Sequence, residues 1–196
     1  MNVSDYELIE RCLSGDKNAF RPLVEQYQRY VFDTVFRMVY NYETAKDLTQ
    51  EVFMKAFAKL HTFNPKYTFG VWIHRIAIHS AIDFLRRRKP EYLILDNDSD
   101  PDALPMREQI ADTSFSPYSK VASSEAFKRI QKAVYELEPK LKAVVILRHF
   151  REMNYDQISD VLKIPLGTVK NRLFRAREKL QEVLLQHQPS VGDTVS

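Results

Sequence analysis

The sequence contains little glycine, a single cysteine and no long hydrophobic run. Only four glycines, together with few runs of β-branched residues, favour helices over strands and predict an all-α protein. One cysteine excludes an internal disulfide and a zinc site built on cysteines. That residue, Cys12, falls in an apolar helical stripe, so we expect it to be a small core residue.

Segments that would direct the chain into a membrane are not found either. The first residues, MNVSDYELIERCLSGDK, carry charges throughout and lack the apolar centre of a signal peptide. No stretch is long and apolar enough to span a bilayer. We therefore expect a protein of the reducing cytoplasm that does not insert directly into a membrane.

Motifs of catalysis are missing from the sequence. It has no HExxH pair, no glycine-rich phosphate loop and no Gly-x-Ser-x-Gly elbow. His79 and Asp83 are spaced to bind a metal or to transfer a proton, but no third ligand follows at a useful spacing. The prediction is a protein that is not an enzyme, with no cofactor, no metal and no small-molecule substrate.

The net charge of +3 hides an uneven distribution along the chain. Residues 1–89 hold 14 Lys and Arg against 10 Asp and Glu, and residues 125–196 hold 13 against 9. Residues 90–124 hold 2 against 7. Two mildly basic blocks are therefore joined by an acidic segment.

The acidic segment contains four prolines, several Asp and Ser residues and no helical period, so it predicts an extended or disordered linker. Such a linker is a simple tether, or it lies in a basic channel that nucleic acid otherwise occupies. The predicted parts of the chain are a first helical domain at 1–89, the linker at 90–118, a second helical domain at 119–187 and a disordered tail at 188–196. Helices are expected near 4–14, 17–40, 43–61, 69–88, 119–136, 140–149, 154–162 and 165–187, with Asp16 as an N-cap.

The pattern YDQISDVLKIPLGTVKNRLFRAREKL, residues 155–180, is the most informative part of the chain. It predicts a short helix, a turn at Lys163-Ile164-Pro165 and a longer basic helix, which is the order of a helix-turn-helix. At 100° per residue, one stripe of the longer helix is apolar and packs on the domain. This stripe consists of Val169, Leu173, Ala176, Leu180 and Leu184.

The opposite face of this helix carries Asn171, Arg175 and Glu178, with cations on both flanks. Arg175 suits a guanine edge and Asn171 an adenine edge, while Phe174 is placed to touch a thymine methyl. The flanking cations suit the two phosphate strands of a major groove. These cations are Lys170 and Arg177 on one side and Arg172 and Lys179 on the other.

The helix predicted from Thr44 to His61 buries an apolar stripe and leaves an acidic strip opposite it. The stripe is Leu48, Val52, Ala56 and Leu60, and the strip is Asp47, Gln50, Glu51 and Met54. An acidic strip with a methionine is suited to docking a basic partner. Taken by itself, the pattern favours an ordinary solvated face.

Aromatic and polar residues alternate in the loop Phe63 to Phe69, and an Arg-rich helix follows it. Aromatic rings that stack on bases and cations that follow the backbone are typical of proteins that bind single-stranded nucleic acid. The alternative is that Trp72 closes a small core and that Phe63 and Phe69 pin the loop, which we favour slightly for Trp72. In the helix, Ile73, Ala77, Ala81, Phe84 and Leu85 are expected to be buried, whereas Trp72, His79, Asp83 and Arg86 fall on the far side.

Four motifs in order resemble a known family, the bacterial extracytoplasmic-function sigma factors of RNA polymerase. They begin at Gly15-Asp16, at Asp47-Leu48-Thr49-Gln50-Glu51, at Phe69-x-x-Trp72-Ile73 and at Ile164-Pro165-Leu166-Gly167-Thr168. The resemblance covers nearly the whole chain except the linker and the tail. Within the family the sequence is most similar to the cell-envelope stress factors of Gram-positive bacteria.

The resemblance implies a fold of two helical sigma domains, two and four, and a role for each predicted surface. The protein would bind core RNA polymerase at its clamp helices and its flap. The clamp helices would be contacted by Asp47, Gln50, Glu51 and Met54. The melted −10 element would be bound by Phe63, Asn64, Lys66, Tyr67, Phe69, Trp72, Arg75, His79, Asp83 and Arg86. The duplex −35 element would be bound by Thr168, Lys170, Asn171, Arg172, Phe174 and Arg175. An anti-sigma factor, expected to be membrane-anchored, would hold the activity off in a stress response.

The role of one residue and two alternative functions stay open at the level of sequence. His79 stands where some members of the family carry Asn, so any base preference set by that position is in doubt. A stand-alone helix-turn-helix regulator that binds DNA as a dimer is an alternative, although no heptad seam is present. An adaptor that binds only protein is a second alternative, and it leaves the face of Asn171 and Arg175 unexplained.

Overall fold

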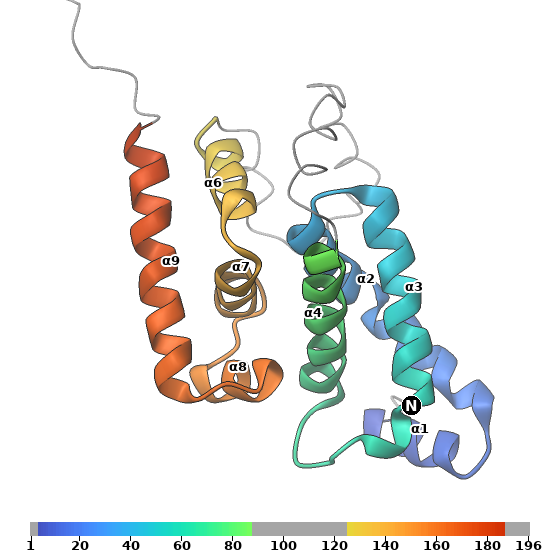
Figure 1. The fold of residues 1–196 in the computed structure, drawn as a ribbon. Coiled ribbons are helices and arrows are strands. Elements are labelled where there is room, and N and C mark those ends of the chain that lie inside the picture. Colours follow the sequence, from blue (N-terminus) through green and yellow to red (C-terminus); the bar gives the residue numbers. More distant parts are fainter. Residues whose placement is uncertain (1–3, 88–124, 187–196) are drawn as a thin grey trace, which may run out of the picture.

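The computed structural model describes residues 4–87 and 125–186, which form two groups of helices lying side by side (Figure 1). The N-terminal group consists of α1 (Asp5–Leu13), α2 (Phe20–Val39), α3 (Tyr42–Ala58) and α4 (Phe69–Arg87). The C-terminal group consists of α6 (Glu125–Glu136), α7 (Pro139–Val145), α8 (Tyr155–Leu162) and α9 (Leu166–Gln186). Short 3₁₀ turns at Lys17–Ala19 and Leu60–Thr62 and a π-helical turn at Ile146–Phe150 complete the two groups.

These helices confirm the all-α prediction within the described parts of the chain. The linker predicted at 90–118, the tail at 188–196 and the first residues of the helix expected at 119–136 lie outside the described residues. The expected cap is also confirmed, because Asp16 Oδ1 accepts a hydrogen bond from the backbone N–H of Asn18 at 3.1 Å. Within residues 4–87 and 125–186, no helix combines the length and the apolar character needed to cross a membrane.

The N-terminal group packs α2, α3 and α4 around an apolar centre, with α1 and its turn at one end. The predicted stripe is buried, since Leu48, Val52 and Ala56 of α3 and Leu60 of the following 3₁₀ turn are all almost inaccessible. Cys12 is half-buried against this core, and burial raises the pKa of its thiol. The sequence therefore predicted correctly which faces of these helices are apolar.

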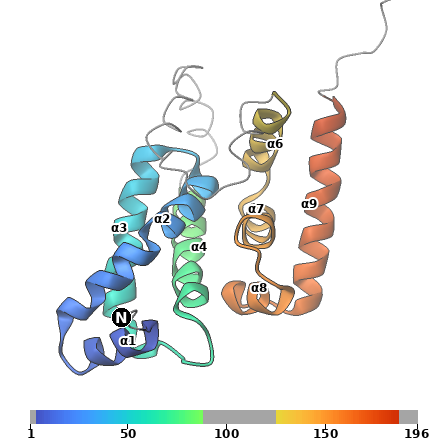
Figure 2. The ribbon, with the colours of Figure 1, turned by 180° about the vertical axis from the view of Figure 1, so that it is seen from behind.

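Helix α4 is the helix of the N-terminal group that faces the C-terminal group (Figures 1 and 2). It contacts α2 and α3 on one side and α7 and α8 on the other. Its buried residues accordingly surround most of the helix: Phe69, Val71, Trp72, Ile73, His74, Ala77, Ile78, Ser80, Ala81 and Leu85. The apolar core continues from this helix into Val144, Ile146 and Leu147 of the C-terminal group. The two groups thus share one core.

Polar contacts join the two groups across the same boundary. Arg151 Nε donates to Thr34 Oγ1 at 2.8 Å, and the Arg151 guanidinium also forms an ion pair with Asp33. The Arg37 guanidinium lies over the Phe150 ring, 4.0 Å from its centroid. Desolvation lowers the pKa values of Arg37 and Arg151 to about 10, so both cations keep their charge at neutral pH.

Lys142 of α7 is buried and caps the end of α2. Its Nζ donates to the carbonyl oxygen of Met38 at 3.2 Å and lies 4.4 Å from the centroid of the Tyr135 ring. A cation is favourable at a helix C-terminus, where the last carbonyls lack partners within the helix. Burial nevertheless lowers the pKa of Lys142 to about 8, because the charged ammonium loses its water.

We predict that the stability conferred by Lys142 depends on pH. Because its folded pKa is depressed, the burial penalty is fully present below pH 8 and declines as the pH rises towards the unfolded value of 10.5. The melting temperature of the native protein, measured between pH 7 and pH 9, should therefore rise relative to that of Lys142→Met. Lys140→Met, which changes an exposed lysine on the same helix, is the control and should give a constant difference. Parallel curves for the native protein and Lys142→Met would contradict the prediction.

Candidate nucleic-acid interface

The helix-turn-helix is stabilised by helix caps and by one residue in the left-handed backbone conformation. Asn154 and Gln157 form a reciprocal capping box at the start of α8, with hydrogen bonds of 2.8 and 2.9 Å. Lys163 ends α8 with φ 54°, and Ser159 Oγ donates to the carbonyl oxygen of Ile164 at 2.6 Å. Pro165 follows, and its carbonyl accepts the first hydrogen bonds of α9. The turn predicted at Lys163-Ile164-Pro165 is therefore present.

Helix α9 divides into a buried and an exposed face, as its sequence predicted. Val169, Leu173 and Ala176 are fully buried against α7 and α8, and Leu180 is partly buried. Asn171, Arg175 and Glu178 are exposed, and the Phe174 side chain is 61% accessible. Of the other predicted −35 contacts, Lys170 is exposed while Thr168 and Arg172 are half-buried. Polar groups with donors and acceptors thus project from one free face of the helix.

One flanking cation of α9 already has a partner within the protein. Lys179 Nζ forms an ion pair with Glu138 Oε1 at 3.0 Å, and this contact lowers the pKa of the Glu138 carboxyl. Lys170 and Arg177, on the opposite flank, are exposed. The two flanks were predicted to be equivalent, but they differ. Lys179 is paired with a carboxylate, whereas Lys170 and Arg177 are exposed.

The loop before α4 is folded by its own polar side chains. Asn64 Oδ1 accepts from the backbone N–H of Lys66 at 3.0 Å, which forms an Asx turn. Thr68 Oγ1 accepts from the N–H of Val71 at 3.3 Å at the start of α4. Asn64 and Lys66 are exposed, so both remain available to a ligand.

Two of the aromatic residues predicted to bind the −10 element lie in the core. Phe69 is 1% accessible and Trp72 is 8% accessible, and their ring centroids lie 5.6 Å apart. Phe63 is half-buried and packs edge-on against Trp72 at 5.7 Å. Both rings contact Phe63 of the loop, and Phe69 also packs edge-on against Tyr27 of α2, so the two residues anchor the loop to the core. The alternative that Trp72 closes a small core is confirmed.

Tyr67 connects this loop to the helix-turn-helix. Its hydroxyl donates to Asp160 Oδ1 of α8 at 3.2 Å, and the acceptor carboxylate raises the pKa of the tyrosine. The two residues are 93 positions apart in the chain, so no local pattern indicates the contact. The loop that the sequence assigned to the −10 element is therefore in direct contact with α8, the first helix of the helix-turn-helix.

The exposed strip of α4 consists of His79, Asp83 and Arg86, with Arg75 half-buried at its edge. Asp83 lies 3.9 Å from Arg86. His79 Nδ1 is hydrogen-bonded to the carbonyl oxygen of Arg75 at 2.8 Å, within its own helix. Among residues 4–87 and 125–186, no cluster of His, Cys, Asp and Glu is arranged to bind a metal.

Helix α3, which carries the acidic strip, lies on the side of the N-terminal group away from the C-terminal group (Figure 1). Asp47 and Gln50 are exposed, and Met54 is 65% accessible. Glu51 is half-buried and pairs with Lys55 Nζ at 2.6 Å, and Lys55 also donates to Ser80 Oγ of α4 at 3.1 Å. The strip therefore presents a free carboxylate and a large apolar side chain next to an internally paired glutamate.

His74 is a polar residue that the sequence did not single out. It is buried in α4, where its Nδ1 lies 2.6 Å from the carbonyl oxygen of Gly70, while Nε2 has no partner among the described residues. Burial lowers the pKa of this imidazole, so the neutral form is favoured. Its place in the run VWIHRIAI, where Arg75 is the other polar residue, was the one available signal.

The fold and these surfaces define an all-helical protein with a helix-turn-helix, and comparisons with known proteins place it in a class. The family model of sigma-70 region 2 matches residues 23–91, and that of sigma-70 region 4 matches residues 127–180. These are two regions of the sigma-70 class, whose members are transcription initiation factors and not enzymes.

The curated relatives specify the family. The chain is 32% identical over 176 residues to the ECF RNA polymerase sigma factor SigW of Bacillus subtilis, covering 90% of this chain and 94% of that protein. It is 33% identical over 186 residues to the RNA polymerase sigma-H factor of Pseudomonas aeruginosa, covering 92% and 93%. The chain belongs to the extracytoplasmic-function sigma factors of RNA polymerase.

Solved structures agree with the fold. CnrH, in complex with the cytosolic domain of CnrY, matches with a TM-score of 0.64 at 20% identity, covering 92% of this chain and 97% of that one. The sigma factor RpoE from Bartonella quintana, in complex with the anti-sigma factor NepR, matches with a TM-score of 0.61 at 22% identity, covering 86% and 98%. At these identities the similarity shows the fold alone.

We predict that Phe69 is needed for stability. Phe69→Ala should lower the free energy of unfolding by roughly 3–5 kcal/mol, because it removes a fully buried ring and leaves a cavity. Phe174→Ala removes the same side chain from an exposed site and should change stability by no more than about 0.5 kcal/mol. Urea denaturation of both variants measures the two effects. Equal losses would place Phe69 outside the core.

Proposed function

We propose that this protein directs core RNA polymerase to two-part promoters, reading a duplex −35 element with α9 and a melted −10 element with the loop before α4. The observation that carries the proposal is the division of α9 into a buried apolar face and an exposed face with Asn171 and Arg175 at its centre. A helix of this form fits the major groove, where bases are distinguished by their donors and acceptors.

At the −35 element, Arg175 donates to the acceptors of a guanine and Asn171 bonds an adenine. Phe174 contacts a thymine methyl through its exposed ring. Lys170 binds the phosphate backbone, as do Arg172 and Thr168 near the start of the helix. The contacts to the phosphate backbone position the helix on the DNA, and the contacts to the bases give sequence specificity.

At the −10 element, the exposed Asn64 and Lys66 and the half-buried Phe63 and Tyr67 form the surface for an unstacked base. The rigid packing of Phe69 and Trp72 beneath the loop supports that surface. The strand then follows the cations and polar groups on the exposed side of α4. These are Arg75, His79, Asp83 and Arg86.

The partner surface is the strip of Asp47, Gln50, Glu51 and Met54 on α3, which docks on the clamp helices of core polymerase, while the C-terminal group reaches the flap. Exposure of Asp47 and Met54 supports this assignment. Regulation by an anti-sigma factor anchored in the membrane is part of the proposal. One solved relative was captured with the anti-sigma factor NepR and the other with the cytosolic domain of CnrY. The site of action is the cytoplasm, where core polymerase and promoters are found.

Transcription with purified core RNA polymerase tests the function directly. Abortive transcription on a library with randomised −10 and −35 positions, with and without the protein, should yield protein-dependent starts that share a two-part motif. If the folded protein gives no stimulation and instead binds duplex DNA selectively by itself, it is a stand-alone regulator and the proposal is wrong.

We predict that Arg175→Ala weakens promoter binding by roughly 1–3 kcal/mol and relaxes the preference at one base pair. The matched control is Arg177→Ala, an exposed cation on the flank of the same helix. That change should weaken binding to all DNA sequences about equally. It should also reduce the slope of log affinity against log salt concentration by about one counterion. Holoenzyme binding to single-substitution promoters at several salt concentrations separates the two effects. A uniform loss for Arg175→Ala would remove its role as a base reader.

We predict that the double change Asp47→Lys and Glu51→Lys abolishes association with core polymerase, because it reverses the charge of the docking strip. The helical content and melting temperature should stay close to those of the native protein, since Asp47 is exposed and Glu51 makes only a surface ion pair. The control is Glu7→Lys with Glu25→Lys, two exposed carboxylates of the same domain. Co-purification with core polymerase is the measurement, and normal association of the first double variant would exclude this surface.

A further inference from the structure

Tyr27 of α2 packs against the point where the loop of residues 63–69, which we call the −10 loop, joins α4. Its ring lies edge-on against Phe69, with the ring centroids 5.1 Å apart. Phe69 in turn lies 6.3 Å from Phe63 and 5.6 Å from Trp72, again between ring centroids. The position of the Tyr27 ring therefore sets the position of Phe69 and, through it, that of the −10 loop.

The fit between Tyr27 and α4 leaves little room for movement. Gly70 follows Phe69 at the start of α4, and a Cβ atom at this glycine would lie 3.3 Å from Tyr27 Cε1. A relaxed carbon–carbon contact is about 3.5–4.0 Å. Only a glycine therefore lets α4 approach the tyrosine this closely, and the ring and the helix backbone are matched in shape.

A hydrogen bond from another helix fixes the orientation of the Tyr27 ring. The hydroxyl donates to Asp5 Oδ2 at 2.5 Å, and the two residues are 22 positions apart. Burial and this carboxylate raise the pKa of the Tyr27 hydroxyl, so it remains a donor at neutral pH. Hydrogen bonds to an ionised acceptor are short and strong. A phenylalanine would fill the same apolar space, but only the hydroxyl gives the ring a directional contact.

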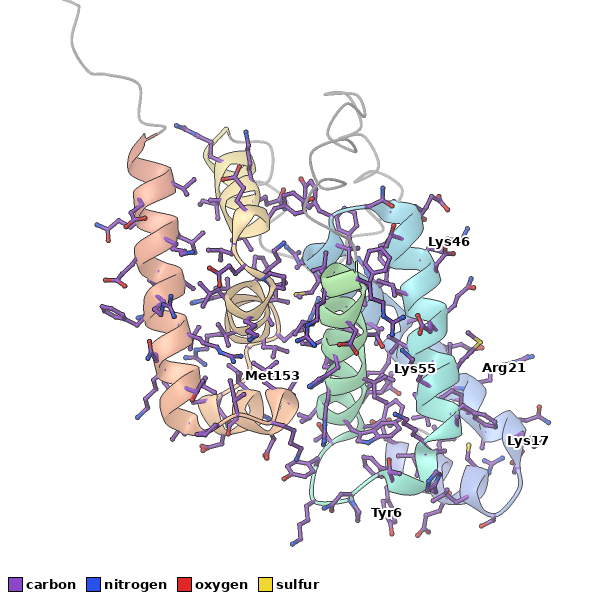
Figure 3. The ribbon with its side chains drawn as sticks, in the orientation of Figure 1. Tyr6, Lys17, Arg21, Lys46, Lys55 and Met153 are labelled. Carbon is purple, nitrogen blue, oxygen red and sulfur yellow. The ribbon has the colours of Figure 1, made fainter. Side chains whose placement is uncertain are left out.

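Asp5 is itself held in place by α1. It is the first residue of that helix, whose Leu8 and Ile9 are buried in the core. The same helix contacts the 3₁₀ turn Leu60–Thr62, which comes immediately before the −10 loop. Tyr6, the residue after Asp5, marks this end of the molecule in Figure 3. Helix α1, which precedes the residues matched by the region 2 model, therefore contacts one end of the −10 loop directly and the other end through Tyr27.

We propose that Tyr27, oriented by Asp5, is a positioning residue for promoter recognition: it fixes Phe69 and thereby places Asn64 and Lys66 to receive the −10 base. This inference rests on the proposed function of the −10 loop. In this role neither Tyr27 nor Asp5 contacts DNA, so their effect reaches the base only through the loop. Reading of the −35 element by α9 does not depend on either residue.

Hydrogen–deuterium exchange of the free, full-length protein tests the placement of the loop. The backbone amides of residues 64–68 should exchange at least about threefold faster in Tyr27→Phe and in Asp5→Ala than in the native chain, because the ring loses its directional contact. Asp5→Asn keeps an acceptor oxygen and should restore most of the protection. The double variant of Tyr27→Phe with Asp5→Ala should be no worse than either single change, since both remove the same bond.

Tyr6→Phe is the matched control. It makes the same chemical change at a neighbouring tyrosine of α1 that is 50% exposed, and it should leave the exchange of the −10 loop unchanged. Unchanged exchange of the buried amides of α3 in every variant shows that the fold is intact.

Recognition is measured with holoenzyme assembled from each variant and core polymerase. Forked promoters carry either the preferred base or a substituted base in a single-stranded −10 tail, with the motif taken from the randomised library. The ratio of the two affinities should fall at least about threefold in Tyr27→Phe and Asp5→Ala. The corresponding ratio for a single substitution in the duplex −35 element should stay unchanged. Tyr6→Phe should give native ratios at both elements.

Gly70→Ala disturbs the same contact from the side of α4. Its new methyl group would press on the Tyr27 ring, although alanine is the better helix former. It should therefore lower the −10 ratio without a loss of helix propensity. This variant keeps the test decisive if Tyr27→Phe or Asp5→Ala does not fold.

The outcomes separate this inference from the proposed function. Faster loop exchange that Asp5→Asn restores, together with a selective loss of −10 discrimination, would establish the positioning role. Unchanged loop exchange in Tyr27→Phe and Asp5→Ala would overturn it and leave the proposed function intact. Faster exchange with −10 discrimination unchanged, or with equal losses at both elements, would do the same. If the native protein gives no promoter-dependent transcription, the proposed function is wrong and the positioning role falls with it, whatever the exchange rates are.

Discussion

The burial of α4 on two sides is the constraint on which the rest of this structure depends. Phe69, Trp72 and Ile73 are buried, and the helix contacts α2 and α3 as well as α7 and α8 of the other group. Because so much of its surface is covered, the exposed strip of α4 is narrow. The same packing fixes the loop that precedes the helix, so the surface proposed for the −10 element is held by the core.

Charged side chains add specific contacts to the apolar packing between the two groups. Apolar surfaces attract without direction, whereas Arg151 on Asp33 and Lys142 on the end of α2 require one relative placement of the two groups. Burying these cations is costly, as the lowered pKa of Lys142 indicates. A contact of this kind is specific and, at the same time, sensitive to the loss of any one partner.

The two surfaces proposed to read DNA differ in their contacts with the rest of the protein. The reading face of α9 is free, with Asn171 and Arg175 exposed on a helix held by Val169 and Leu173. The −10 loop is engaged, because Tyr67 is bonded to α8. The loop before α4 is therefore held by the C-terminal group as well as by its own turn.

The sequence by itself determined the helices, their buried stripes and the exposed face of α9, because these depend on local periodicity, caps and turn residues. The stripe of Leu48 and Val52 and the turn at Pro165 were predicted correctly for this reason. Only the tertiary structure decided that Trp72 is a core residue, that Lys179 pairs with Glu138 and that Tyr67 meets Asp160. These facts depend on contacts between residues up to 93 positions apart or on the second layer of helices over α4, and no local pattern encodes either.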